Sequence, residues 1–153
     1  MQQRSPTSPF NVGAQIRLDE FNRDQLSALN DKYGKRLKTP DEVQSLFDLI
    51  GGHPFLIRQA LYALFSNQWS MTQLESEAIS DTGPFGDHLR RFLWSLQDSR
   101  ELKASVIQIL RSGQCDDEKH FQRLSAAGLA RGETRGAARM RCRLYHDYFS
   151  KHL

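Results

Sequence analysis

The residues with the most suggestive chemistry form a short run of two glycines, a histidine and a proline. Gly51, Gly52, His53 and Pro54 separate two segments whose apolar residues recur at helical spacing. Glycine takes the left-handed conformation that ends a helix, and proline is favoured in the first turn of the next one. The run therefore predicts a rigid corner between two helices. The turn itself needs only the glycines and the proline. A histidine there usually serves as a helix cap or packs its ring, so His53 is the residue left to consider for function.

A second candidate is a basic segment near the C-terminus. Three arginines alternate with three apolar residues, and this period of two predicts a strand with one charged face (Arg139, Arg141 and Arg143; Met140, Cys142 and Leu144). Residues 129–131 are its predicted partner, joined through a loop over 132–136. Together with Arg123 on the preceding helix, these arginines could contact nucleic-acid phosphates. They could equally line a solvated face, and the acids over 116–118 would face phosphates unfavourably.

Patterns for independent catalysis are missing from this sequence. The Gly34-Lys35 pair lacks the earlier glycine of a Walker A loop and is followed by Arg36. No apolar strand ends in paired acids that could hold Mg²⁺. Cys115 lies near His120, but no second ligand pair accompanies them, so we predict no metal site. Neither cysteine lies in a nucleophile elbow. We therefore expect no enzyme activity, and no nucleotide hydrolysis, from this chain alone.

The composition indicates a folded protein of one domain or two small helical subdomains. The chain has 153 residues, of which 39% are hydrophobic and 10% aromatic, which is enough for a packed core. The net charge is a mild +3. Two cysteines are too few for a disulfide framework. No signal peptide or membrane span is recognisable, so we expect a cytoplasmic protein with reduced thiols and no membrane partner.

Strong start signals predict four helices in the first half. Asn22 with Gln25, and Ser70 with Gln73, have capping-box spacing, and Thr39 precedes a proline at the first helical position. Apolar residues at helical spacing predict the buried faces of these helices: Leu26, Leu29 and Tyr33, then Val43, Leu46, Phe47 and Ile50, then Ile57, Ala60, Leu61, Leu64 and Phe65, then Leu74 and Ala78.

The second half has a different plan, separated from the first by helix breakers over 81–84. Three amphipathic helices are followed by the basic hairpin and by a terminal helix over 144–153. Three helices and a hairpin are the plan of a winged helix. We therefore predict a linker or arm over 1–16, with a short strand over 15–18. A helical subdomain over 17–80 and a winged-helix subdomain over 84–153 follow. The expected fold class is mainly α with a small β-hairpin.

Several segments, in this order, resemble the C-terminal portion of AAA-like STAND ATPases, the signal-transduction P-loop NTPases. Residues 8–13 and 16–21 look like the passage that leaves the nucleotide-binding core. The run Gly-Gly-His-Pro-Phe-Leu-Ile-Arg over 51–58 resembles the family's lid motif. Residues 124–129 and 141–149 are similar to its winged-helix segment. The resemblance extends over nearly the whole chain from Ser8.

This resemblance implies that the helical subdomain is a lid whose Gly52, His53 and Pro54 face a nucleotide. His146, followed by aspartate, is similar to the phosphate-sensing histidine of the family's Met-His-Asp signature, although Tyr145 stands in place of the methionine. ATP or ADP would be bound only with a P-loop core, because the 153 residues contain no Walker motifs. The expected partner is therefore such a core or an effector protein.

The function that we predict is a non-catalytic module of an AAA-like STAND ATPase that couples nucleotide state to an effector or to oligomerisation. One alternative is a DNA-binding winged-helix regulator that uses the arginines of the hairpin. Another is a simple protein-interaction adaptor, which would bind neither nucleotide nor DNA.

Overall fold

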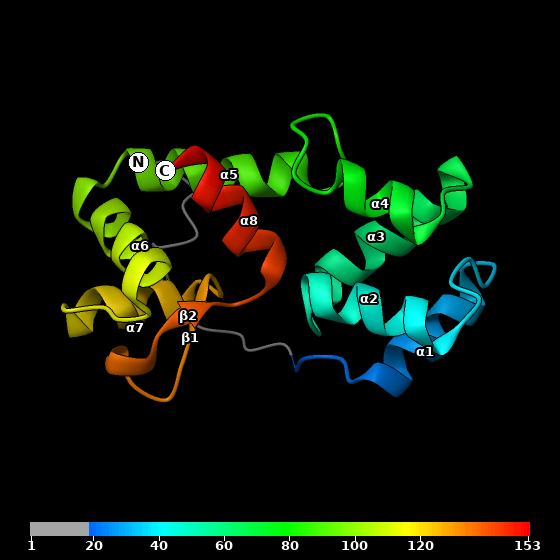
Figure 1. Ribbon diagram of the computed structural model, residues 1–153, viewed down its shortest axis with the longest axis horizontal. Coiled ribbons are helices and arrows are strands. Elements are labelled where there is room, and N and C mark those ends of the chain that lie inside the picture. Colours follow the sequence, from blue (N-terminus) through cyan, green and yellow to red (C-terminus); the bar gives the residue numbers. More distant parts are fainter. Residues whose placement is uncertain (1–18) are drawn as a thin grey trace, which may run out of the picture. The chain divides into compact units, whose positions relative to one another are not determined.

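The computed structural model describes residues 19–153 of the chain (Figure 1). The predicted arm over 1–16, the strand over 15–18 and the family-like segment over 8–13 lie outside the described residues. The described part contains eight α-helices, a short 3₁₀ turn and one two-stranded antiparallel sheet. The predicted fold class, mainly α with a small β-hairpin, is therefore confirmed.

The described residues form two compact units, which we call the N-terminal unit and the C-terminal unit. The N-terminal unit holds residues 19–87 together with 142–144, and the C-terminal unit holds residues 88–141 and 145–153. In the N-terminal unit, α1 packs against α2, and α4 packs against both α2 and α3. The helices of this unit are α1 (Arg23–Lys32), α2 (Pro40–Ile50), α3 (Pro54–Asn67) and α4 (Met71–Glu77).

The predicted helix starts of the N-terminal unit are confirmed. The Asn22 side chain accepts a hydrogen bond from the Gln25 backbone N–H at 2.8 Å, and the Gln25 side chain accepts one in return at 2.9 Å. Ser70 and Gln73 form the same capping box at the start of α4. Thr39 caps α2 with Pro40 at the first position. Each cap satisfies backbone donors that the first turn leaves without an intrahelical partner.

One predicted core position of α3 is wrong. Phe65 is 54% exposed, whereas Leu56 and Ala63 are buried beside the predicted Ile57 and Leu61. At 100° per residue the buried stripe of α3 is centred between Leu56 and Leu61, so Phe65 falls at its margin. The Phe65 ring lies instead against Gly34. Leu29, Tyr33 and Phe47 are only half-buried.

In the C-terminal unit, α6 packs against α7 and β2, and α7 packs against β1. α5 and α8 meet through aromatic side chains, because the rings of Phe92 and Tyr145 lie 5.5 Å apart. The amphipathic helices predicted here bury one face each, with Leu89, Leu124 and Phe149 completely buried. The elements are α5 (Gly86–Gln97), α6 (Arg100–Ser112), α7 (Glu118–Ala126), β1 (Ala130–Arg131), a 3₁₀ turn (Arg135–Ala137), β2 (Arg139–Met140) and α8 (Arg143–His152). The first two residues of α5 and of α8 are assigned to the N-terminal unit.

The basic strand is shorter than predicted. β2 contains only Arg139 and Met140, and α8 begins at Arg143, so the extension of the strand to Leu144 is wrong. Met140 and Leu144 are four residues apart, which suits a helix as well as a strand. The terminal helix decides between the two, because Leu144, Tyr145, Tyr148 and Phe149 are all completely buried at helical spacing.

Candidate functional site

The corner between α2 and α3 is built on two glycines with different roles. Gly51 ends α2 and donates its backbone N–H to the Phe47 carbonyl at 2.8 Å. Its φ of 64° and ψ of −154° lie in a region that is essentially restricted to glycine. The helix therefore stops at this residue, as the sequence predicts.

Gly52 is required for a different reason, which is the close approach of another backbone segment. It is buried, and its carbonyl accepts a hydrogen bond from the Phe21 backbone N–H at 2.8 Å. A Cβ atom on Gly52 would lie 2.2 Å from the Phe21 carbonyl oxygen. The corner is thus fixed to the segment that leads into α1, and no larger residue fits there without a backbone shift.

His53 is the N-cap residue of α3, followed by Pro54 at the first helical position. Its carbonyl accepts the first helical hydrogen bond from Ile57 at 3.0 Å, but its side chain does not cap the helix. The ring is half-buried and lies edge-on to Phe55, with the ring centroids 6.3 Å apart. Cap formation therefore does not explain the histidine side chain.

His146, the second predicted nucleotide-facing histidine, is exposed on α8, and its Nδ1 lies 3.3 Å from the Asp147 carboxylate. It belongs to the C-terminal unit, whereas His53 belongs to the N-terminal unit. The surroundings of His53 and of His146 are therefore described separately, each within its own unit.

The hairpin places two arginines directly opposite each other. Arg131 pairs with Arg139, and Ala130 pairs with Met140, in antiparallel register. Ala130 and Met140 are buried, whereas both arginines are exposed, so the arginines lie on the face of the hairpin that points away from the core. Arg131 was missed as a site residue in the sequence, because the partner strand carries only this one charge. The cross-strand register is the signal that identifies it.

The other predicted arginines have different surroundings. Arg123 is exposed in the last turn of α7. The Arg141 guanidinium folds over the turn at Gly128, 2.8 Å from where a Cβ atom of that glycine would be. Arg143 is the first residue of α8 and lies 3.4 Å from the Glu75 carboxylate, within the N-terminal unit.

The acidic cluster over 116–118 starts a helix. Asp117 caps α7 by accepting the His120 backbone N–H at 2.9 Å. This hydrogen bond, assisted by the nearby charges of His120 and Lys119, holds the pKa of the exposed Asp117 carboxyl below its usual value. Glu118 lies 3.5 Å from Arg135. Asp117 and Glu118 thus both interact with neighbouring groups of the protein.

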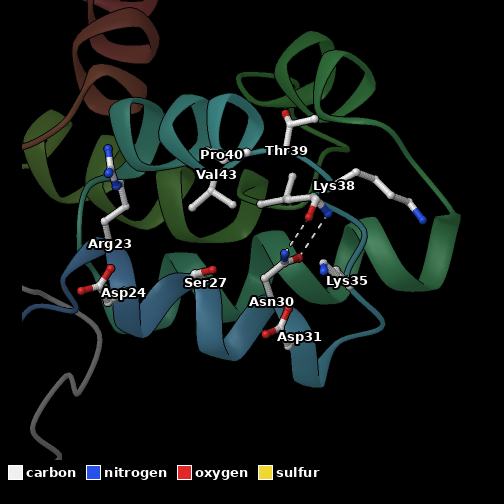
Figure 2. Close-up of a pocket in the computed structure, with 11 residues that line it drawn as sticks. Arg23, Asp24, Ser27, Asn30, Asp31, Lys35, Lys38, Thr39, Pro40 and Val43 are labelled. Atoms are coloured by element: carbon white, nitrogen blue, oxygen red, sulfur yellow. Dashed lines mark hydrogen bonds between the residues drawn. The ribbon is translucent and has the colours of Figure 1, made fainter.

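An open cavity of about 350 Å³ lies between α1 and the start of α2 (Figure 2). One of its lining residues, Asn30, is 2% exposed and forms two hydrogen bonds with the backbone of Leu37. The Asn30 amide donates to the Leu37 carbonyl at 2.8 Å, and its oxygen accepts the Leu37 N–H at 3.2 Å. Charged residues of both signs line the cavity (Arg23, Asp24, Asp31, Lys35 and Lys38). None of the predicted site residues lines this cavity.

Comparison with protein families identifies one match, to the AAA-like domain, over residues 1–151. The chain belongs to the AAA-like domain family. No similar protein was found among curated proteins, and none among solved structures. The family match includes both the corner at Gly52 and the arginines of the hairpin.

A cluster of three polar side chains in this AAA-like domain protein lies between α6 and α7. Ser105 Oγ is 2.9 Å from His120 Nδ1, and His120 Nε2 is 3.6 Å from the Glu101 carboxylate. Ser105 is only 6% exposed, and the hydrogen bond between its hydroxyl and His120 joins the two helices. Among residues 19–153, no cluster of His, Cys, Asp or Glu could hold a metal ion, and no helix has the length and apolarity that crossing a membrane requires.

Proposed function

We propose that this AAA-like domain protein is a regulatory module in which the N-terminal unit acts as a lid over ADP or ATP. The nucleotide would be held by a P-loop core in another segment or another polypeptide. The C-terminal unit, as a winged helix of the STAND type, would couple nucleotide state to an effector or to oligomerisation. The observation that supports this proposal best is the fixed corner at Gly52, His53 and Pro54 in a chain of the AAA-like family.

The corner has the chemistry that an anionic nucleotide requires. The N-terminus of a helix carries a partial positive charge and backbone N–H groups without an intrahelical partner, and both attract phosphates. α3 has 14 residues and starts without a side-chain cap from His53. An imidazole beside the helix start can add a hydrogen-bond donor for a phosphate. Gly52 contributes by fixing the position of this turn against Phe21.

Because the proposed lid depends on a separate P-loop core, we predict that the isolated chain does not hydrolyse ATP. Residues 1–153 contain no Walker A or Walker B sequence to hold Mg²⁺ and the phosphates. We expect phosphate release from the purified chain at the level of the buffer blank. Turnover that persists through successive purification steps and disappears in His53→Ala would contradict this prediction.

The proposal also predicts weak but local binding of ADP by the isolated chain. A lid supplies only part of a nucleotide site, so we expect a dissociation constant on the order of 1 mM, or about −4 kcal/mol. Titration of ¹⁵N-labelled protein with Mg·ADP should shift amide resonances over 51–57, because these backbone groups surround the start of α3.

Matched variants separate this site from non-specific attraction of an anion. His53→Ala should weaken the shifts over 51–57 several-fold, whereas Arg131→Ser with Arg139→Ser should leave them unchanged. Shifts confined to the hairpin, or none over 51–57 at about ten times the expected dissociation constant, would exclude the corner as a nucleotide contact.

A further inference from the structure

We propose that the exposed face of the hairpin binds the phosphate backbone of nucleic acid through Arg131 and Arg139. We call this surface the arginine hairpin and define it as residues 130–140. It lies in the C-terminal unit and is independent of the nucleotide corner. The inference rests on the register of the two strands, on the surroundings of the two arginines and on the fixed geometry of the hairpin.

The register places two like charges at directly opposite positions. Arg131 and Arg139 are Cα partners across the antiparallel pair. Side chains at such positions start about 5 Å apart, and like charges there destabilise the sheet. Within residues 19–153, neither arginine forms an ion pair or a hydrogen bond through its side chain. A phosphate diester between the two guanidinium groups would neutralise this repulsion.

The hairpin is held in place by backbone hydrogen bonds to its surroundings. The Ala138 N–H donates to the Gly113 carbonyl at 2.9 Å, and the Cys115 N–H donates to the Arg135 carbonyl at 2.8 Å. The Arg141 N–H extends the ladder by donating to Leu129 at 2.9 Å. Arg131 and Arg139 therefore project from a fixed two-stranded ribbon, so binding orders few further backbone groups.

The hairpin itself carries an excess of positive charge. Residues 130–140 contain three arginines and one acid, Glu133. Of the nearby acids at the start of α7, Asp117 caps the helix and Glu118 pairs with Arg135. The whole chain is also positive, with a net charge of +3 at pH 7.

Nucleic acid fits this surface better than an acidic protein does. Guanidinium groups match phosphate oxygens through paired N–H donors, and a two-stranded ribbon can lie along a duplex groove. The arginine face offers no exposed apolar side chain from its own strands, since Ala130 and Met140 are buried beneath it. A protein partner normally requires such an apolar centre in its interface.

Fluorescence anisotropy with a labelled 20-base-pair duplex tests the proposal. We expect a dissociation constant of about 1–100 μM near physiological salt, tightening at 50 mM KCl. The double variant Arg131→Ser with Arg139→Ser should weaken binding at least tenfold at 50 mM KCl. It should also reduce the slope of log K against log salt by about 1.8, which corresponds to two phosphate contacts.

The control is Arg91→Ser with Arg111→Ser, two exposed arginines on α5 and α6 whose loss changes the net charge equally. It should retain most of the affinity of the wild type. The proposal is overturned if both double variants lose affinity equally, if no binding occurs at 50 mM KCl with about 100 μM protein, or if polyglutamate binds as tightly as the duplex. A single-stranded 20-mer as a second probe shows which form of nucleic acid binds better, and either form supports the proposal. A negative result in this experiment would not affect the proposed nucleotide site, which the Mg·ADP titration tests separately.

Discussion

Gly52→Ala is expected to lower the free energy of unfolding of the N-terminal unit by about 3 kcal/mol, the upper part of the range for overpacking. The added methyl group would meet the Phe21 carbonyl oxygen at 2.2 Å and the Phe21 nitrogen at 3.0 Å. Both are backbone atoms, so no side-chain rotation relieves the clash. Relief requires separating the corner from the segment before α1, which also breaks the hydrogen bond from Phe21 to Gly52.

The two tryptophans allow each unit to be followed separately. Trp69 lies in the N-terminal unit and Trp94 in the C-terminal unit. Urea denaturation of Gly52→Ala in a Trp94→Phe background should show a lower transition midpoint in Trp69 fluorescence. Gly136→Ala is the control, read through Trp94 after Trp69→Phe, because a Cβ atom at Gly136 meets only a threonine hydroxyl at 3.8 Å. A change below about 0.5 kcal/mol for Gly52→Ala would show that the close approach is not maintained in solution.

Tyr145→Ala is expected to destabilise the C-terminal unit by about 3–5 kcal/mol, the usual cost of removing a large buried aromatic side chain. Tyr145 is completely buried in α8. Its ring lies 5.8 Å from the His88 ring in a stacked arrangement and 5.5 Å from the Phe92 ring. Its hydroxyl lies 2.7 Å from His88 Nε2. Alanine would lose this packing and the hydrogen bond, and would leave a cavity between α5 and α8.

Tyr145→Phe separates the hydrogen bond from the packing. It keeps the ring and removes only the hydroxyl, so we expect a cost of about 1–2 kcal/mol. Ser150→Ala, at an exposed position on the same helix, should change stability by less than about 0.5 kcal/mol. Urea denaturation followed by Trp94 in a Trp69→Phe background measures all three. Equal effects of the alanine and phenylalanine variants would mean that ring packing contributes little.

The helix starts could be predicted because they depend on local chemistry. Asn22, Thr39 and Ser70 each accept a hydrogen bond from the backbone three residues later, so residue type and spacing suffice. The end of α2 at Gly51 follows similarly from the backbone conformation that glycine permits. The mainly α fold class depends on such signals, summed over the chain.

Features that depend on residues distant in sequence could not be predicted. The approach of Phe21 to Gly52 spans about thirty positions, and Asn30 acts through the backbone of Leu37, which no spacing rule indicates. The end of β2 could not be predicted because the spacing of Leu144 from Met140 fits both a strand and a helix. Burial of the apolar face of α8 favours the helix. Arg131 became a candidate only through its register with Arg139.

For the candidate site, the sequence singled out His53 by elimination, and the structure sharpens the reason. Gly51 and Gly52 are explained by backbone geometry and Pro54 by its helical position, whereas the His53 side chain caps nothing. The proposed function assigns this side chain to a nucleotide, on the grounds of its place at the start of α3 and of the family match.

Paramagnetic broadening by Mn·ADP tests this assignment most directly, because it reports the distance between the bound metal–nucleotide complex and each backbone amide. With ¹⁵N-labelled protein and Mn²⁺ alone as the reference, the proposed function predicts selective broadening over 51–57 that is lost in His53→Ala. Broadening that spares this corner, or that is the same with Mn²⁺ alone, would contradict it.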